Sequence, residues 1–293
     1  MSNSNQMFLL LTFIYAAALS CVNGGNVLIR PFMGGGSHYM VAKVIAAELV
    51  NRGHSVTMVV QDRDEEQLRA AGEDKLFNFE FHRSNFTQEE FDYLLQNITD
   101  AGLKGKYMEH MVSLMGTGHM EKIASECDNL IGDVELVSRL RHSNFDVAII
   151  DGSDQCPILQ FLGGPYVVLL PSCSTVSPIL FANRMPFNPS YVPEMVTGYD
   201  HRMSFVGRLK NTANAMFFAG FFKAFGSSLE ELKARYERLS DVSLFFTNAD
   251  LWLINTHFVL DFPRPLLPNT VTVGGLTTKD ARPLAQVSAF MRM

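Results

Sequence analysis

A histidine and an aspartate stand where two predicted strands of this sequence end. His38 follows the apolar run 26–31 and the loop 34–37, and Asp151 closes the apolar run 146–151. The carboxyl ends of parallel strands meet at one edge of a sheet, so we expect the two side chains to lie close together. An aspartate that accepts from one imidazole nitrogen leaves the other nitrogen free to take a proton from a hydroxyl group. This spacing predicts a general base that activates an alcohol or phenol. The same spacing also fits a structural histidine at the start of a helix and an aspartate that only belongs to a turn or cap.

The glycine-rich loop before His38 has the position of a phosphate cradle in nucleotide-binding folds. The dinucleotide fingerprint needs a third glycine one turn into the helix, but no glycine occurs between Gly36 and Gly53. The P-loop also fails, because no Gly-Lys-Ser/Thr is present. Asp62 lies at the end of the second predicted strand, where a ribose-binding acid would sit. An oxidoreductase that binds a nicotinamide cofactor therefore stays open as an alternative.

The elements that carry these residues alternate between strand and helix. Residues 26–31 and 55–60 are short apolar runs, and residues 38–52 between them contain neither proline nor glycine. This helix is apolar nearly all round, so we expect it to be buried. A strand–helix–strand unit requires parallel strands, and the predicted fold is an α/β, Rossmann-like parallel sheet with helices on both faces. Further strands are expected at 146–151, 165–171, 251–255 and 270–275.

Charged and amphipathic stretches fill the intervals between the strands. Residues 62–74 are typical of a solvated helix, and residues 88–141 of several helices. Two further helices are expected at 204–225 and 228–239. The stretch 216–225 is rich in phenylalanine and is too short to span a membrane. It suits a core helix, and the alternative is peripheral contact with a membrane surface.

Composition excludes several classes of protein. The chain has 293 residues, is 47% hydrophobic and carries a formal net charge of −6, which is typical of a globular protein without a nucleic-acid partner. The Met/His-rich stretch 108–120 suits an adaptable apolar helix face better than a soft-metal site, and no metal is predicted. Cys127, Cys156 and Cys173 lack zinc-site spacing, so one disulfide or buried free thiols remain open.

The first residues predict entry into the secretory pathway. Residues 1–24 combine an apolar stretch with a small-residue end, which is typical of a signal peptide. Asn85 and Asn97 begin the sequons Asn-Phe-Thr and Asn-Ile-Thr and are predicted glycosylation sites. No later apolar run reaches about 18 residues, so the predicted location is the lumen of the endoplasmic reticulum or the exterior.

Several motifs of this sequence occur together in one family. The most specific is Ala-Asp-Leu-Trp-Leu-Ile-Asn at 249–255, which runs into Asp-Phe-Pro-Arg-Pro-Leu-Leu-Pro at 261–268. The other segments are 36–38 with 52–56, 145–151 with 156–157, 189–193 with 200–205, and 273–276. Together these motifs resemble the N-terminal half of an animal UDP-glycosyltransferase of the glucuronosyltransferase type, and the resemblance extends from about residue 26 to residue 284.

The resemblance implies a fold and a reaction. It implies the N-terminal domain of a GT-B fold, which binds a small lipophilic acceptor beside the loop Gly35, Gly36 and Ser37. It makes His38 the catalytic base and Asp151 its partner in an inverting transfer. The co-substrate is a UDP-sugar, expected to be UDP-glucuronate or UDP-glucose, and no cofactor is bound by this half.

Departures from the family pattern shape the remaining expectations. Tyr39 stands where the family usually has tryptophan, and Gly152 replaces a common proline, which predicts a loosely held Asp151. Residues 25–284 are predicted to form the acceptor domain and residues 285–293 a divergent end, with the donor-binding domain absent. This half alone is then expected to be inactive. The alternative is a non-catalytic module that binds lipophilic ligands or pairs with a full-length relative.

Overall fold

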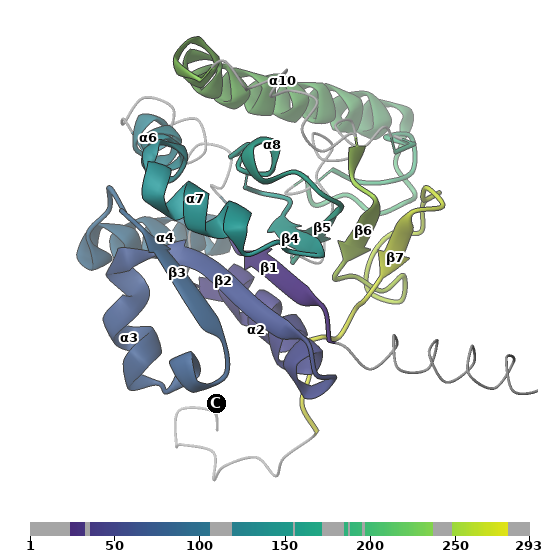
Figure 1. Ribbon diagram of the computed structural model, residues 1–293. Helices are drawn as coiled ribbons and strands as arrows, with labels where there is room; N and C mark the ends of the chain where they lie inside the picture. The colour runs from purple at the N-terminus through teal and green to yellow at the C-terminus, as the bar shows by residue number, and fades with distance from the viewer. Residues whose placement is uncertain are drawn as a thin grey trace, which may run out of the picture.

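A parallel β-sheet forms the centre of the molecule (Figure 1). The computed structural model describes residues 24–32, 36–105, 119–154, 156–171, 185–186, 188–194, 197–236 and 248–280. Within these residues the strand order is β3-β2-β1-β4-β5-β6-β7, and every neighbouring pair is parallel, as the sequence predicted. The strands are β1 (Asn26–Arg30), β2 (Ser55–Gln61), β3 (Asn78–His82), β4 (Val147–Asp151), β5 (Tyr166–Leu170), β6 (Leu251–Ile254) and β7 (Thr270–Thr272).

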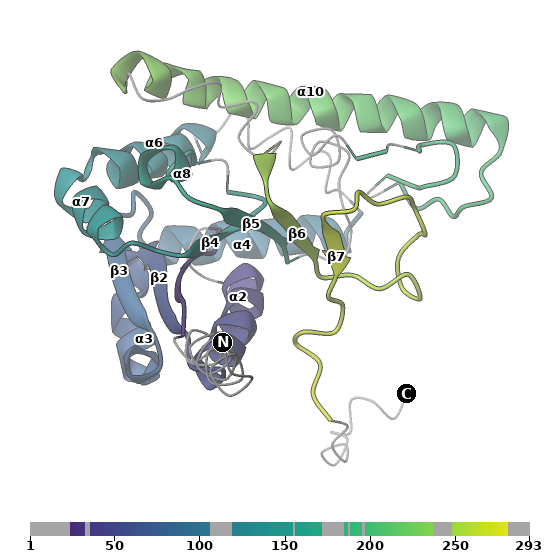
Figure 2. The same ribbon diagram turned by 45° about the vertical axis from the view of Figure 1, so that its right-hand side comes forward.

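Helices cover both faces of this sheet (Figure 2). One face carries α2 (Gly36–Asn51) and α3 (Glu65–Ala70). The opposite face carries four helices, which are α6 (His119–Gly132), α7 (Val134–His142), α8 (Leu159–Leu162) and α10 (Phe205–Arg235). The remaining described elements are α4 (Gln88–Leu103) and the short 3₁₀ turns η1 (Asp62–Asp64) and η2 (Glu73–Lys75). This arrangement confirms the predicted Rossmann-like class.

Alternation along the strands divides the core into two layers. In β1, Val27 and Ile29 pack toward α2, whereas Leu28 packs toward α6 and α7. In β4, Ile149 faces α2, and Ile150 faces the other layer. Successive side chains of a strand point to opposite faces. In β1 and β4 the odd-numbered residues therefore face α2, and the even-numbered residues face α6 and α7; residues of equal parity share a face.

Helix α2 is only partly buried, which corrects the expectation that it is covered all round. Ala42 and Ala46 are 1% and 0% exposed against the sheet, because their small side chains allow a close approach. Met40 and Val44 are 60% and 37% exposed. The expectation was wrong because the one-sided contact of a surface helix also tolerates scattered apolar residues on its outer face.

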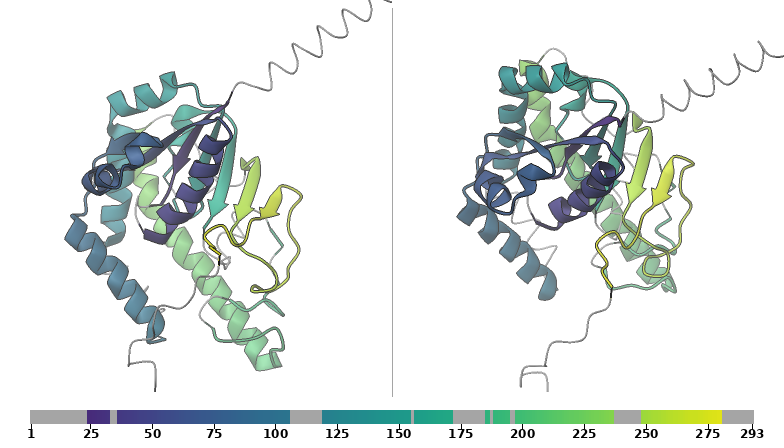
Figure 3. Two further views of the ribbon diagram at one scale, coloured as in Figure 1. Left: turned by 90° about the horizontal axis from the view of Figure 1, so that it is seen from below. Right: turned by 60° about the horizontal axis from the view of Figure 1, so that its bottom comes forward.

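Helix α10 is continuous where two helices were predicted. It begins after Ser204, whose hydroxyl accepts the Gly207 amide at 3.1 Å, and it runs through Gly226 without a break. An interior glycine costs about 1 kcal/mol relative to alanine, and a long packed helix can tolerate that cost. Its first half extends past β7 in two views (Figures 2 and 3). Asn211, Ala215 and Phe218 form the buried side of that half.

Several predicted segments lie outside the described residues. They include residues 1–23 of the predicted signal peptide, the stretch 106–118, Gly35, Cys173 and residues 281–293. Among the described helices, none has the length and hydropathy that a membrane crossing requires.

Candidate active site

His38 and Asp151 meet at the carboxyl edge of the sheet, as their spacing predicted. The His38 Nδ1 atom lies 2.7 Å from the Asp151 Oδ2 atom. The Asp151 side chain is 1% exposed, whereas the His38 side chain is 28% exposed. The carboxylate is therefore shielded, and the imidazole remains open to a ligand.

The carboxylate determines which nitrogen of His38 carries the proton. An ionised aspartate only accepts hydrogen bonds, so Nδ1 donates to it and Nε2 is left as the proton acceptor. Burial by itself lowers the pKa of His38, but the hydrogen bond to Asp151 and its negative charge reverse that effect, and the pKa is raised above 6.5. The Asp151 contact therefore makes His38 a stronger base.

Each member of this pair, the His38–Asp151 dyad, is placed by its element. His38 lies in the first turn of α2, after Gly36, whose φ of +69° favours glycine. Asp151 ends β4 with the parity of Ile149, so it faces the α2 side of the sheet. Neighbouring parallel strands and one turn of helix thus bring together groups that are 113 positions apart in sequence.

The second oxygen of Asp151 is also bonded, and the following glycine is firmly held. Asp151 Oδ1 accepts the Ser153 amide at 2.8 Å. The Gly152 amide donates to the Leu169 carbonyl at 2.7 Å and so extends the ladder between β4 and β5. A Cβ atom at Gly152 would lie 2.3 Å from Leu170 Cδ2, so a larger residue would require the Leu170 side chain to move. The expected loosening of Asp151 is therefore wrong, because a proline here would lose a strand hydrogen bond that glycine makes.

An apolar ring lies beside the imidazole of His38. The Phe32 ring centroid lies 5.8 Å from that of His38. Phe32 also packs against the buried cluster of Phe86, Phe91 and Leu94. Gly36 and Ser37 are exposed beside His38, whereas Gly35 lies outside the described residues.

Asp62 and Tyr39, which the sequence analysis singled out, both form hydrogen bonds within the fold. The Asp62 carboxylate accepts the Ser84 amide at 2.9 Å, so it supports the loop after β3. The Tyr39 hydroxyl donates to Glu73, and Lys43 donates to the same carboxylate at 2.6 Å. Burial and the hydrogen bond to Glu73 both raise the pKa of Tyr39. Tyrosine in place of the family's tryptophan therefore anchors α2 to η2.

The structure also contains a buried polar cluster that the sequence did not reveal. Arg30 ends β1 and pairs with the carboxylate of Asp154, and its Nη1 atom donates to His82 Nε2 at 3.1 Å. Burial and the charge of Arg30 lower the pKa of His82 to about 3, so this histidine is neutral. The only signal in the sequence was polar residues at the ends of apolar strands, which does not identify partners.

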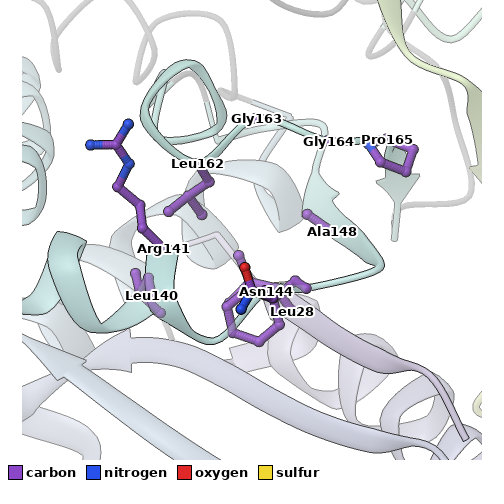
Figure 4. Close-up of a pocket in the computed structure, with 10 residues that line it drawn as sticks. Leu28, Leu140, Arg141, Asn144, Ala148, Leu162, Gly163, Gly164 and Pro165 are labelled. Carbon is purple, nitrogen blue, oxygen red and sulfur yellow. The ribbon is translucent and has the colours of Figure 1, made fainter.

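A pocket of about 210 Å³ lies at the other end of the sheet (Figure 4). It is bounded by the turns before β4 and β5, and Asp151 lies at the opposite end of β4. The pocket is therefore separate from the dyad. The residues that line it include Arg141, Asn144, Leu162, Gly163, Gly164 and Pro165. Within the described residues, no group of three or more His, Cys, Asp or Glu side chains could hold a metal ion.

The two predicted glycosylation sites differ in their surroundings. The Asn85 amide donates to Ser125 Oγ at 2.6 Å, and its oxygen accepts from Asn129 at 3.0 Å. Asn97 lies within α4, where the Thr99 hydroxyl donates to the Leu95 carbonyl at 2.9 Å. Modification of either asparagine stays a prediction, and at Asn85 it would displace a hydrogen bond of the folded chain.

Comparison with known proteins gives a consistent family. The family model described as "UDP-glucoronosyl and UDP-glucosyl transferase" matches residues 25–292. The chain is similar to UDP-glucuronosyltransferase 3A1 of Bos taurus, with 32% identity over 86% of this chain and 48% of the relative. It is also similar to UDP-glucuronosyltransferase 3A2 of Homo sapiens (31%, covering 86% and 48%) and 2B1 of Rattus norvegicus (30%, covering 89% and 50%).

Solved glycosyltransferases resemble the chain more distantly. The glycotransferase of kitacinnamycin shares 14% identity, covers 82% of this chain and 48% of its own, and has a TM-score of 0.45.

The sheet and the His38–Asp151 dyad define a Rossmann-like α/β domain with a histidine–carboxylate pair at the carboxyl edge of its sheet. The chain belongs to the UDP-glucuronosyl and UDP-glucosyl transferase family. It spans about half the length of the curated relatives that it matches.

Proposed function

We propose that this chain supplies the acceptor site and the catalytic base of a UDP-glycosyltransferase. The reaction moves a sugar from a UDP-sugar, UDP-glucuronate or UDP-glucose, to the hydroxyl group of a small lipophilic acceptor. The observation that carries the proposal is the 2.7 Å contact between His38 and Asp151 beside the apolar Phe32. A base that is open to ligand and oriented by a shielded carboxylate is what hydroxyl activation needs.

The proposed reaction is a single displacement at the anomeric carbon of the sugar. His38 Nε2 takes the hydroxyl proton of the acceptor, and the acceptor oxygen forms a bond to the anomeric carbon. The bond between that carbon and the UDP oxygen breaks, and UDP leaves with the electron pair, so the anomeric configuration inverts. Asp151 stabilises the imidazolium that forms. A positioned general base contributes about 10²–10⁴-fold in rate.

A fluorescent phenol tests the acceptor site directly. The probe is 4-methylumbelliferone, whose phenolate absorbs at longer wavelength than its phenol. We expect the bound probe to show more phenolate than the free probe at the same pH, because His38 accepts its proton. The His38→Gln variant should bind the probe but lose the phenolate signal.

A matched substitution completes this experiment. His142 is an exposed histidine on α7, at the end of the sheet away from the dyad, and His142→Gln should keep the phenolate signal. Binding without a phenolate signal in the unaltered chain would favour the alternative function, a non-catalytic module for lipophilic ligands. No binding at all would contradict both functions.

We also propose that α10 holds the protein against an anionic membrane surface. Phe205, Leu209 and Met216 are 73%, 62% and 67% exposed, on the side of α10 away from Asn211 and Ala215. No acidic residue occurs between Asp200 and Glu230, although the chain as a whole is acidic. Exposed apolar groups flanked by basic residues are typical of helices that lie in the membrane interface.

Vesicle sedimentation tests this contact. The double variant Leu209→Ser/Met216→Ser should sediment less with vesicles that contain phosphatidylserine than the unaltered chain does. Val259→Ser removes an apolar side chain that is 81% exposed in another region and serves as the control. Equal sedimentation of all three proteins would reject the membrane contact.

The proposed location is the lumen of the endoplasmic reticulum or the exterior. A disulfide joins Cys127 of α6 to Cys156, and disulfides persist in oxidising compartments. This bond supports entry into the secretory pathway. Pairing with a full-length relative remains part of the proposal for the non-catalytic alternative.

A further inference from the structure

The carboxyl edge of the sheet has a second polar side, opposite the dyad. Arg30 has the parity of Leu28 and therefore points toward α6, whereas Asp151 points toward α2. His82, at the end of β3, contacts Arg30 on that second side. Asp154 follows Asp151 by three positions and pairs with Arg30. Polar side chains therefore lie on both faces of the sheet at this edge.

The Arg30–Asp154 pair is almost completely shielded from water. The two side chains are 5% and 6% exposed. Asp154 Oδ1 also accepts the Cys156 amide at 3.0 Å. Removing two charges from water costs about as much as their attraction returns, so a buried pair is weak evidence for stability. Net stabilisation alone therefore does not explain the buried pair, and the positions of the groups that it holds together are the next question.

The chain connects this pair directly to the dyad. The Asp154 amide donates to the Asp151 carbonyl at 2.9 Å, and the Ser153 amide donates to Asp151 Oδ1. These bonds make residues 151–154 one tight turn. Arg30 pairs in register with Ile150, the residue before Asp151, and the same strand leads through Phe32 toward His38. The pair therefore ties the strand end that leads to the base to the turn that carries its carboxylate.

We propose that Arg30 and Asp154 are a positioning pair that holds the Asp151 turn so that its carboxylate stays directed at His38. Neither residue touches the proposed acceptor, because both lie on the face opposite the dyad. The inference rests on the proposed function, and it adds two residues to the machinery of that site.

The test measures the pKa of the His38 imidazole by NMR on the full chain, labelled at its histidines. The His38 signal is identified by its loss in His38→Gln, and Asp151→Asn establishes the effect of losing the carboxylate. The decisive variant is Arg30→Met/Asp154→Asn. It removes both charges without leaving either one unpaired, and asparagine keeps an oxygen for the Cys156 amide.

The expected result is a downward shift of the His38 pKa in the double variant, in the direction that Asp151→Asn produces. Arg30→Lys, which keeps a cation beside Asp154, should retain the raised pKa. Arg264→Met/Asp261→Asn is the matched control. Arg264 is 5% exposed and pairs at 2.5 Å with Asp261, which follows β6, so loss of both charges should leave the His38 pKa unchanged.

Two results would overturn the positioning role. One is a folded double variant with the His38 pKa of the unaltered chain. The other is a double variant that does not fold, because the pair would then serve stability rather than direction. Failure of the proposed function is distinct, because it would appear as the absence of a phenolate signal from 4-methylumbelliferone while the His38 pKa still responds to Asp151→Asn.

Discussion

His38 is partly exposed and His82 is buried, and their neighbours move their pKa values in opposite directions. At His38, the effect of burial is overcome by the hydrogen bond and charge of Asp151, and the pKa is raised. At His82, burial and the charge of Arg30 act together, and the pKa falls to about 3. One histidine is therefore ready to gain a proton, and the other is kept neutral.

These shifts predict opposite effects of pH on stability. A raised pKa gives stability that is complete below 6.5 and is lost as the pH rises through the folded pKa. His38→Gln should thus cost more free energy of unfolding at about pH 5 than at about pH 8.5. His82 must charge on unfolding in acid, so stability is lost as the pH falls from 6.5 toward 3. His82→Gln should therefore cost less at about pH 4 than at about pH 7.5.

Urea unfolding at these pH values measures both differences. The His142→Gln variant, at an exposed position, serves as the control for the substitution itself. If the cost of His38→Gln and of His82→Gln did not depend on pH, the effects assigned to Asp151 and Arg30 would be contradicted.

Among single residues, the sequence predicted the His38–Asp151 dyad but not the Arg30–Asp154 pair. His38 and Asp151 were found because each stands at the end of an apolar run, where topology brings strand ends together. Arg30 and Asp154 also stand near strand ends, but nothing in a linear pattern shows that two charges 124 positions apart share a buried contact. The effect of Gly152 was misjudged for the same reason, because the Leu169 carbonyl and the Leu170 side chain that contact it belong to another strand.

Among the elements, buried strands were predictable and the edge strand β3 was missed. The apolar runs of β1, β2, β4 and β5 have few polar residues, which is typical of strands covered on both faces. Strand β3 has only five residues, 78–82, and they alternate between polar and apolar side chains. Glu80 of that strand is partly exposed and pairs with Arg139 at 2.9 Å, so the strand carries the charge of a sheet edge.

The disulfide between α6 and the turn after β4 resolves the alternative that the cysteines left open. Cys127 and Cys156 are 29 positions apart and form the bond, and both are buried. Closing a loop of this length limits the unfolded chain and stabilises the fold by about 3–4 kcal/mol in the chain-entropy model. Cys127→Ala/Cys156→Ala should lower the free energy of unfolding by about that amount.

Unfolding in urea with and without dithiothreitol provides the measurement. The reductant should destabilise the unaltered chain and should have no effect on the double variant. A reductant effect of equal size in both proteins would show that the stabilisation comes from another source.

The chain spans about half the length of the relatives that it matches, and the activity of these 293 residues by themselves can be predicted and measured. The chain covers 48% of UDP-glucuronosyltransferase 3A1, and the resemblance assigns donor binding to the other half. A base accelerates transfer only when the leaving group is held in line with the acceptor oxygen. We therefore predict that the purified chain with 4-methylumbelliferone releases no more UDP from UDP-glucuronate or UDP-glucose than buffer does.

An assay of UDP release checks this prediction at the scale of the molecule. The His38→Gln variant should give the same background. Turnover by the unaltered chain that disappears in the variant would show that the chain binds and positions a donor by itself.

The parity of β4 also offers a rule for the comparison of homologues. An acid at the position of Asp151 reaches the base under α2, but the same acid moved by one place along the strand would point into the α6 layer. Single-residue insertions or deletions in this strand should therefore abolish the dyad even where the composition of the segment is preserved. An alignment that shifts this segment by one residue would hide such a loss, so the odd or even spacing from the strand centre is the safer guide.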